Sequence, residues 1–235
     1  MKNVVVLQSN YIPWKGYFDL INDADVFIFY DDLQFTKNDW RNRNKIKTEQ
    51  GLRWLSIPVG SNAKRLICDV ALNDASWQKC HWNSLQRQYE KCSFFKLYRE
   101  FFEDIYLNRI WTNLSELNHA LIKTIAQDIL GIKTQFRDSR EFALHGKKLD
   151  RLLDLVLQSE ATHYITGPAA RGYIEPARFA EMKVELVWKD YSHYPEYAQA
   201  HPPFEHGVTI LDLLFNAGPQ ASWYIWGWRG GERIA

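Results

Sequence analysis

The sequence predicts an α/β fold: a Rossmann-like, mostly parallel sheet with a helical lobe formed by the middle of the chain. Short β-branched runs and a helical pattern alternate near the start of the chain, which is typical of an α/β layer architecture. No glycine or proline occurs between Gly60 and Gly131, and this favours long helices there. We therefore expect a single domain over residues 1–235, with an α/β core at about 1–70 and 160–225 and a helical lobe at about 75–158.

The individual elements follow from local patterns. Val4–Leu7 and Val26–Tyr30 are apolar runs typical of buried strands, and Lys15–Asp23 between them places its apolar side chains at helical spacing. If the two strands are parallel neighbours, as we expect, Gln8–Trp14 and Asp31–Phe35 follow them at the carboxyl edge, where such folds bind ligands. In chain order, the later elements are a strand at Leu52–Val59, helices between Trp77 and Leu130, strands at Tyr164–Thr166 and Val184–Trp188, a loop at Tyr191–Gly207, and a helix or strand from Val208 to Phe215.

Composition excludes several classes of protein. Twenty-nine basic and 28 acidic residues give a net charge of +1, so affinity for a partner does not come from bulk positive charge. The three cysteines form no CxxC pair, which argues against a disulfide framework or a zinc knuckle. The apolar run near the first residue is too short for a signal peptide, and no stretch of about 18 apolar residues occurs. We expect a cytoplasmic protein without a membrane span, a metal or a cofactor, and with aromatic residues (15%) lining a cleft.

The segment Lys37–Lys47 holds the densest cluster of cations. Arg41, Arg43, Lys45 and Lys47 recur at every second residue, so in an extended chain they share one face and Asn42, Asn44 and Ile46 share the other. A row of guanidinium and ammonium groups suits a phosphate or pyrophosphate ligand. The same pattern also fits a solvated edge strand, in which charges prevent further strand pairing. The spacing alone leaves both interpretations open.

Other polar residues are candidates for chemistry. The pair Asp31-Asp32 follows a predicted strand, where it fits a general base, a metal site or a simple turn. His81 lies in a helical pattern and fits a structural role as well as a catalytic one. His206 ends the segment His201–His206 (HPPFEH), which suits a base better than a metal ligand because no cysteine is near. The segment Gly167–Tyr173 follows a predicted strand and is a weak candidate for a ligand loop.

Longer blocks resemble a known family. These blocks are Gln8–Phe18 (QSNYIPWKGYF), Tyr30–Gln34 (YDDLQ), Asp39–Lys47 (DWRNRNKIK), Trp54–Val59 (WLSIPV), Tyr164–Pro168 (YITGP), His201–Gly207 (HPPFEHG) and Ile210–Asn216 (ILDLLFN). In this order they resemble the WbqC-like protein family over essentially the whole chain. Ser9 departs from the pattern, because relatives usually have proline there. The resemblance implies a product of bacterial surface-polysaccharide clusters, especially O-antigen clusters, and a glycine transferase acting on an amino sugar.

The resemblance and the residues together suggest a transferase of lipopolysaccharide biosynthesis. It would place a glycyl, aminoacyl or other acyl group on the amine of a nucleotide-linked amino sugar, with charged tRNA, an adenylate or a thioester as open choices of donor. We expect the base to be His206 or Asp32, with Asp31 and His81 as further catalytic candidates, and the oxyanion to bind Asn10, Asn38 or backbone amides. The expected substrate contacts are Gln8, Asn10, Tyr11, Trp14, Asn38, Arg41, Asn42, Arg43, Lys45, Gly167, Arg171 and Tyr173. The oligomeric state is left open.

Two alternatives belong to other classes. The first strand, loop and helix resemble the opening unit of adenylate-forming nucleotidyltransferases, in which Gly16 corresponds but the histidines of that motif are absent. That analogy suggests an enzyme that activates the amino acid itself. The aromatic tail Trp223–Ala235 suggests instead a non-catalytic scaffold for polysaccharide enzymes.

Overall fold

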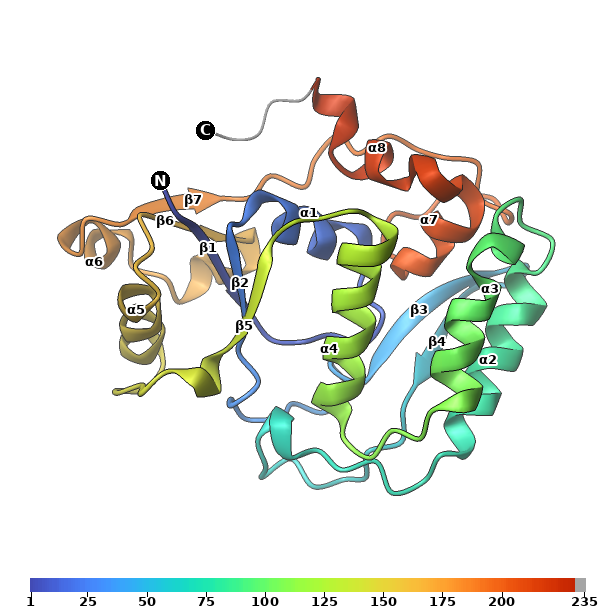
Figure 1. Ribbon diagram of the computed structural model, residues 1–235, viewed down its shortest axis with the longest axis horizontal. Coiled ribbons are helices and arrows are strands. Elements are labelled where there is room, and N and C mark those ends of the chain that lie inside the picture. Colours follow the sequence, from blue (N-terminus) through green and yellow to red (C-terminus); the bar gives the residue numbers. More distant parts are fainter. Residues whose placement is uncertain (231–235) are drawn as a thin grey trace.

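The computed structural model describes residues 1–230, and a five-stranded parallel sheet lies at its centre (Figure 1). The strands run in the order β5-β2-β1-β6-β7. Their bounds are β1 Asn3–Leu7, β2 Val26–Phe29, β5 Gln135–Asp138, β6 His163–Thr166 and β7 Glu185–Trp188. The predicted α/β class is confirmed. The predicted parallel pairing of the first two strands is also confirmed, because Val4 lies opposite Val26 and Leu7 opposite Phe29.

Side chains alternate between the two faces of the sheet and so build two cores. Val5 and Phe27 pack with α1 (Lys15–Asp23) on one face. Val4 and Val6 pack with α5 (Leu149–Gln158) and α6 (Pro176–Glu181) on the other. Each such apolar side chain contributes roughly 1.5–3 kcal/mol when fully buried. Figure 1 shows α5 and α6 on the side of the sheet away from α1 and α4.

The strand order creates a crevice at one edge of the sheet. The crossover from β1 through α1 leads to β2, while the later crossovers place β6 and β7 on the other side of β1. The direction of winding therefore reverses between β1 and β6. In doubly wound sheets the crevice outside the carboxyl ends of the strands at this reversal is the usual ligand site.

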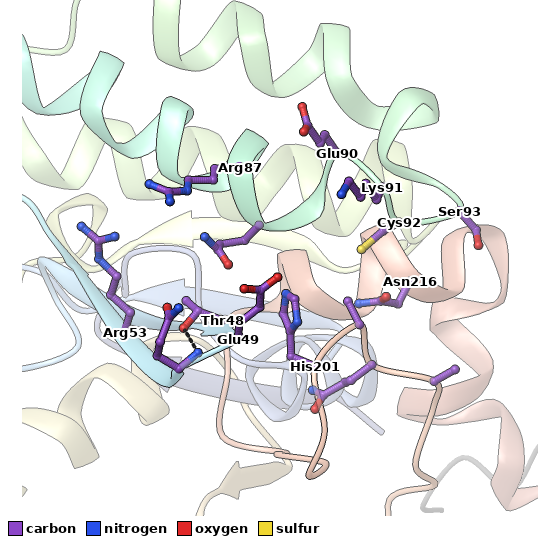
Figure 2. Close-up of a pocket in the computed structure, with 15 residues that line it drawn as sticks. Thr48, Glu49, Arg53, Arg87, Glu90, Lys91, Cys92, Ser93, His201 and Asn216 are labelled. Carbon is purple, nitrogen blue, oxygen red and sulfur yellow. Dashed lines mark hydrogen bonds between the residues drawn. The ribbon is translucent and has the colours of Figure 1, made fainter.

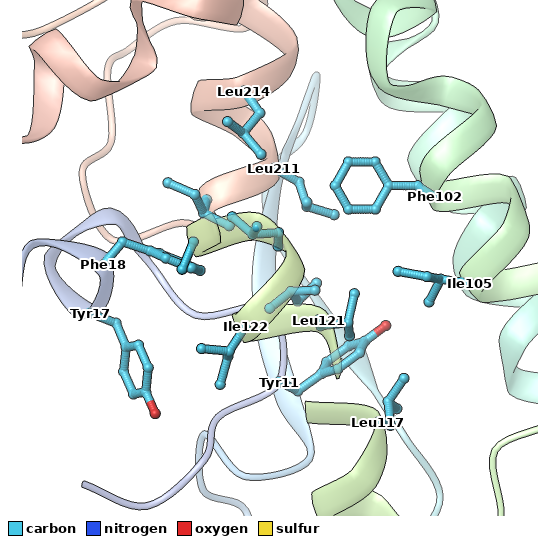
Figure 3. Close-up of a cluster of buried hydrophobic side chains, with 14 of the residues drawn as sticks. Tyr11, Tyr17, Phe18, Phe102, Ile105, Leu117, Leu121, Ile122, Leu211 and Leu214 are labelled. Carbon is cyan, nitrogen blue, oxygen red and sulfur yellow. The ribbon is translucent and has the colours of Figure 1, made fainter. Parts of the chain in front are cut away.

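The helical lobe and a β-hairpin complete the structure. The lobe consists of α2 (Ser76–Tyr89), α3 (Phe95–Glu103) and α4 (Leu114–Thr124), and π-helical turns extend α3 to Asn108 and α4 to Ile129. The hairpin pairs β3 (Arg43–Thr48) with β4 (Gly51–Ser56) and packs β3 against α2. The strand expected at Leu52–Val59 therefore belongs to this hairpin and ends earlier, at Ser56. Figure 3 shows where the lobe meets the C-terminal helix α7 (Ile210–Ala217), through side chains such as Phe102, Leu121 and Leu214.

One strand lies where we expected only helices. β5 and α5 fall within residues 75–158, yet β5 pairs with β2 at the edge of the central sheet. β5 has four residues, QFRD, and only Phe136 among them is a large apolar residue. The local sequence gives little strand signal, and hydrogen bonding to β2 decides the conformation instead.

The C-terminal segment packs against the first helix. After α8 (Ala221–Ile225), the guanidinium of Arg229 donates to both carboxylate oxygens of Asp19 on α1, at 3.0 and 2.8 Å. Trp223 is half exposed, whereas Trp226 and Trp228 are partly buried. The part of the aromatic tail beyond Gly230 lies outside the described residues. In the range 1–230 no helix combines the length and apolar character needed to cross a membrane.

Candidate functional site

A buried carboxylate lies at the carboxyl end of β2. Asp31 is fully buried, and its oxygens accept hydrogen bonds from the Ser9 amide (2.8 Å), the Ser9 hydroxyl (2.7 Å) and the Ser115 hydroxyl (2.7 Å). Nε2 of His119 lies 2.9 Å from the same carboxylate. Burial alone would raise the pKa of Asp31, but the hydrogen bonds from His119, Ser115 and Ser9 lower it below its ordinary value. Asp31 is therefore an anion held in place by four donors.

The carboxylate fixes the imidazole of His119. A carboxylate anion only accepts hydrogen bonds, so Nε2 carries a hydrogen, and the neutral tautomer that fits this contact has its lone pair on Nδ1. The ring stacks on Phe29, with centroids 3.8 Å apart and planes 17° apart. In residues 1–230 no protein group forms a hydrogen bond with Nδ1. His119 thus has a fixed ring and a nitrogen without a protein partner, two features of a general base, although it is not a lining residue of the cavities described below.

Sequence reasoning missed His119. The residue lies one helical turn after Ser115 on α4, and both contact Asp31. That spacing of four on a helix face was the available signal, but it is common in helices of any function. Nothing in the sequence shows that this face meets a carboxylate 88 positions earlier.

Arg41 connects this network to the loop after β1. Its Nη2 donates to Oε1 of Gln8 at 2.8 Å, and its Nη1 donates to Oδ1 of Asn10. The backbone oxygen of Arg41 accepts a hydrogen bond from Asn118, the neighbour of His119, at 2.9 Å. The expected proximity of Gln8, Asn10 and Arg41 is therefore present in the structure.

Two cavities open beside Arg41. One of about 530 Å³ lies at the reversal between β1 and β6, and one of about 310 Å³ lies between the β1 loop and the hairpin. Arg41 donates a hydrogen bond to one lining residue of each cavity, which is Gln8 in the larger and Asn10 in the smaller. The larger is lined by Val6, Leu7, Gln8, Tyr30, Leu33, Lys148, Leu149, Leu152, Tyr164, Tyr173 and Glu175. The smaller is lined by Asn10, Pro13, Trp14, Trp40, Asn44 and Gly207.

A third cavity, of about 700 Å³, lies apart from these two (Figure 2). Figure 2 shows Arg87 and Lys91 from the end of α2 on one side, and Glu49 and His201 on the other. Residues from the hairpin turn, the end of α2 and the loop around His201 line it, and none of them is a site residue expected from the sequence.

In the Asp31-Asp32 pair, the second carboxylate contacts different partners from the first. Asp32 accepts a hydrogen bond from the Ser139 hydroxyl at 2.5 Å and forms an ion pair with Arg151 of α5. The adjacent residues Asp31 and Asp32 therefore serve two different networks. In residues 1–230 no cluster of three or more histidine, cysteine, aspartate or glutamate side chains suits a metal ion.

The expected alternation along the basic segment is present, but its cations have different environments. Asn44 is buried and donates to the Tyr11 and Ile12 carbonyls at 3.1 and 2.9 Å, and Asn42 is buried and donates to the Ile57 carbonyl. Arg43 and Lys45 lie on the outer face of the hairpin. Lys47 shares their side of the strand by register but is buried, and its ammonium group contacts the Pro203 carbonyl.

The outer face of the hairpin combines cations with indole rings. The Arg43 guanidinium lies 4.2 Å from the Trp54 ring centroid, and the Lys45 ammonium lies 5.2 Å from Trp54 and 5.9 Å from Trp40. Arg43 also donates to the backbone oxygen of Asn38, whose own side chain is exposed. Trp40 lines the smaller cavity as well. The basic strand thus borders that cavity, while its use by a ligand stays a prediction.

Tyr11 and His81 lie inside the helical lobe. The Tyr11 hydroxyl is 2.8 Å from Nδ1 of His81 and 2.6 Å from the Tyr106 hydroxyl, and Tyr11 is fully buried (Figure 3). Burial lowers the pKa of His81 to about 4. Both rings pack edge-to-face against Trp77, and neither lines one of the two cavities beside Arg41. These contacts favour the structural interpretation of His81.

The remaining expected residues lie near the cavities to different degrees. His206 precedes Gly207 of the smaller cavity, and its pKa is lowered by partial burial and by the charge of Lys15. Trp14 lines the smaller cavity, and a Cβ on Gly16 would come within 2.3 Å of its ring, so glycine is needed there. Tyr173 lines the larger cavity. A Cβ on Gly167 would lie 3.1 Å from the Tyr191 hydroxyl, and the Arg171 guanidinium lies over the Trp188 ring; neither residue lines the larger or the smaller cavity.

The fold and the site define a doubly wound α/β protein with a polar network at the carboxyl edge of its sheet. The model of the WbqC-like protein family matches residues 8–224, so the chain belongs to that family. It is 44% identical over 227 residues to a Mycobacterium tuberculosis (strain ATCC 25618 / H37Rv) protein named "Uncharacterized protein Rv1507c", a match that covers 96% of this chain and 98% of that protein. No solved structure matches the chain significantly.

Proposed function

We propose that this protein is an acyltransferase of surface-polysaccharide biosynthesis, acting in the assembly of O-antigen. It transfers a glycyl or other acyl group to the amine of a nucleotide-linked amino sugar. The observation that carries the proposal is the His119–Asp31 pair, with its free Nδ1, at the carboxyl edge of a doubly wound sheet. Transfer to an amine needs such a base, because the attacking nitrogen must lose a proton.

The bonds and protons of the reaction balance with one base. The neutral amine attacks the carbonyl carbon of the donor, and Nδ1 of His119 removes a proton as the C–N bond forms. The tetrahedral intermediate collapses when the bond to the leaving group breaks, and His119 returns the proton to that group. The leaving group is a tRNA hydroxyl, an adenylate phosphate or a thiol, according to the donor.

Asn10 is suited to stabilise the oxyanion. Its side-chain oxygen accepts a hydrogen bond from Arg41, which orients the amide. In the described part of the chain its amide nitrogen has no hydrogen-bond partner, and Asn10 lines the smaller cavity. A donor fixed before the reaction begins stabilises the developing charge without reorganisation. Asn38 is less suitable, because its side chain is exposed outside this cavity.

Cationic side chains near the two cavities suit the binding of the two substrates. Every candidate donor contains a phosphate, either in tRNA, in an adenylate or in the carrier of a thioester. Lys45 lies over Trp40, which lines the smaller cavity, and Arg43 lies over the neighbouring Trp54, so both cations suit that phosphate. Arg41, which joins the walls of both cavities, would hold the reacting groups of donor and acceptor near each other.

Among the candidate bases, the contacts favour His119. The Asp32 carboxylate already accepts a hydrogen bond from Ser139 and forms an ion pair with Arg151, so both of its oxygens are engaged. His206 is partly exposed and has a lowered pKa, so it is neutral at pH 7, but no carboxylate forms a hydrogen bond with its ring in residues 1–230. His206 therefore serves as the competing base in any mutational test.

Mass spectrometry of the surface polysaccharide tests the proposal. A strain that lacks the protein should produce a repeat unit lighter by one acyl group, and the wild-type gene should restore the mass. A gene that encodes His119→Gln should not restore it, whereas one that encodes His163→Gln should. A repeat unit of unchanged mass in the deletion strain would refute the proposed function.

A further inference from the structure

The larger cavity has the position and shape of a ligand site of its own. It measures about 530 Å³ and lies where the winding of the sheet reverses, between the carboxyl ends of β1 and β6. Residues from both strands line it, including Leu7 of β1 and Tyr164 of β6. The start of α5 and the loop before α6 close its other side. Its volume fits a ligand of nucleotide size.

Tyr30 lines this cavity, and its hydroxyl is buried beside it. The side chain is only 7% exposed, the hydroxyl has no partner at hydrogen-bond geometry in the described residues, and the Arg151 guanidinium is the charge that acts on it most strongly. Burial raises the pKa of Tyr30 to about 12, so the hydroxyl is a neutral donor at physiological pH. A buried donor without a partner costs free energy, and a ligand oxygen would remove that cost once the Tyr30 side chain turned toward the cavity.

The first turn of α5 gives the cavity a positive side. Lys148 and Leu149 line it, and α5 begins there without a side-chain cap. The backbone N–H groups of a first helical turn lack acceptors within the helix, and the helix dipole is positive at this end. Arg151 on the same turn lies near the Tyr30 hydroxyl and opposes the rise of its pKa. Arg151 is paired with Asp32, so Lys148 and the start of α5 are the groups that suit an anion in the cavity, and phosphate is the usual anion at such a helix end.

Two further residues suit the rest of a nucleotide. Glu175 also lines the cavity, and an acidic side chain can accept hydrogen bonds from ribose hydroxyls. Tyr173 lines it too, and its ring is 60% exposed, which is unusual for an aromatic side chain without a partner. An exposed ring at the cavity mouth can stack on a nucleobase.

We propose that the larger cavity binds a nucleoside diphosphate, with its phosphates at Tyr30, Lys148 and the start of α5. Glu175 then contacts the ribose, and Tyr173 stacks on the base. This inference deepens the proposed function and rests on it for one point, that the bound nucleotide is the nucleotide part of the amino-sugar acceptor. The sugar would extend from the β-phosphate toward Gln8 and Arg41, which border the same cavity.

Calorimetric titration of the full chain with UDP and dTDP tests the inference. Tyr30→Phe and Lys148→Ala should each weaken binding about tenfold or more, because each removes a contact to a charged phosphate. The matched control is Lys147→Ala, which removes the same charge one residue outside the cavity lining and should change the affinity less than about twofold. Circular dichroism and thermal unfolding should show that each variant keeps the fold.

Further ligands and outcomes separate this inference from the proposed function. Tyr173→Ala should weaken UDP binding but leave the binding of inorganic pyrophosphate unchanged. If wild type binds neither UDP nor dTDP, or if the cavity variants all match wild type, the inference is wrong. Acyl transfer to a sugar nucleotide with normal rates in the cavity variants would overturn the inference and leave the proposed function standing. Nucleotide binding that depends on Tyr30, without any acyl transfer, would support the inference and refute the proposed function.

Discussion

One histidine–carboxylate pair lies at the carboxyl ends of the strands in the sheet, and a second lies at their amino ends. The two pairs differ in burial. At the carboxyl edge, His119 Nε2 lies 2.9 Å from Asp31, which is fully buried. At the amino edge, His163 Nε2 lies 3.1 Å from Glu185, whose side chain is 69% exposed. The second nitrogen of His163 also contacts the Thr162 hydroxyl at 2.9 Å, whereas that of His119 has no protein partner in residues 1–230.

The comparison teaches that residue types alone do not identify a catalytic pair. An exposed ion pair contributes about 0–1 kcal/mol and leaves its histidine free to change partners. A buried carboxylate with four donors keeps one orientation and fixes the tautomer of its histidine. The His119–Asp31 pair therefore has the arrangement of a base and its orienting group, and the His163–Glu185 pair serves as its natural control.

The largest expected effect follows from removing the base. His119→Gln keeps a side chain of similar length but loses the proton acceptor, so kcat for acyl transfer should fall by about 10²- to 10⁴-fold. Binding of UDP should change less than about twofold. A steady-state transfer assay with a glycyl donor measures the first quantity and calorimetry the second. The matched variant His163→Gln should retain the wild-type kcat, and an equal loss in both variants would remove the distinction between the two edges.

The buried carboxylate should contribute to stability in a pH-dependent way. The pKa of Asp31 is lowered in the folded protein, so its contribution is present above the unfolded pKa, about 3.9, and is lost as the pH falls through the folded value. Asp31→Asn should therefore lower the free energy of unfolding by about 2–3 kcal/mol at pH 7.

Urea unfolding between pH 3 and pH 7 measures this effect. The difference between wild type and Asp31→Asn should shrink toward the acid end of the range, whereas Glu185→Gln should leave stability unchanged throughout. A constant difference at every pH would mean that the charge of Asp31 does not stabilise the fold.

Arg41 should matter for both substrates. Arg41→Ala removes the hydrogen bonds to Gln8 and Asn10, one in each cavity, and should raise the KM of both donor and acceptor about tenfold. Arg41→Lys should recover only part of this loss, because a lysine cannot donate to both amides in the same fork geometry. If the KM of only one substrate rose in Arg41→Ala, Arg41 would not serve both binding sites.

The smallest effect is expected on the outer face of the hairpin. Arg43→Ala should raise the KM of the acyl donor about threefold, because Arg43 already stacks on Trp54 and bonds to Asn38. UDP affinity should not change. Titrations at fixed salt check both, and a tenfold loss of UDP affinity would instead assign the nucleotide to the basic strand, as one interpretation of the sequence suggested.

Strongly apolar elements could be predicted from the sequence, and so could the parallel pairing of the first two strands. The strands around Val4 and Val26 and the helix Lys15–Asp23 have patterns that few alternatives satisfy, and the structure has all three. β5 was missed because its hydrogen bonds to β2, not its own residues, make it a strand. The predicted alternation holds for Arg43 and Lys45 of the basic strand. Arg41 precedes β3 and contacts the β1 loop instead, and the burial of Lys47 depends on a loop 156 residues away.

Only some residues of the candidate site could be predicted from the sequence. Gln8, Asn10, Asp31 and Arg41 belong to dense polar motifs next to predicted strands, and the structure brings them into connected networks. Ser115 and His119 come from a helix in another part of the chain, and a linear pattern does not show which helix face meets a strand end. Tyr11 was expected at the cleft, but its ring fills the interior of the helical lobe.

The tautomer of His119 tests the central claim most directly. Nitrogen-15 NMR of the imidazole rings at about pH 8, with His119→Gln used for assignment, distinguishes a nitrogen that carries hydrogen from one that does not. His119 should show a protonated Nε2 and a free Nδ1 in one stable tautomer, while His163, whose carboxylate partner is exposed, should exchange between forms. A His119 ring protonated on Nδ1, or on both nitrogens at that pH, would contradict its assignment as the base.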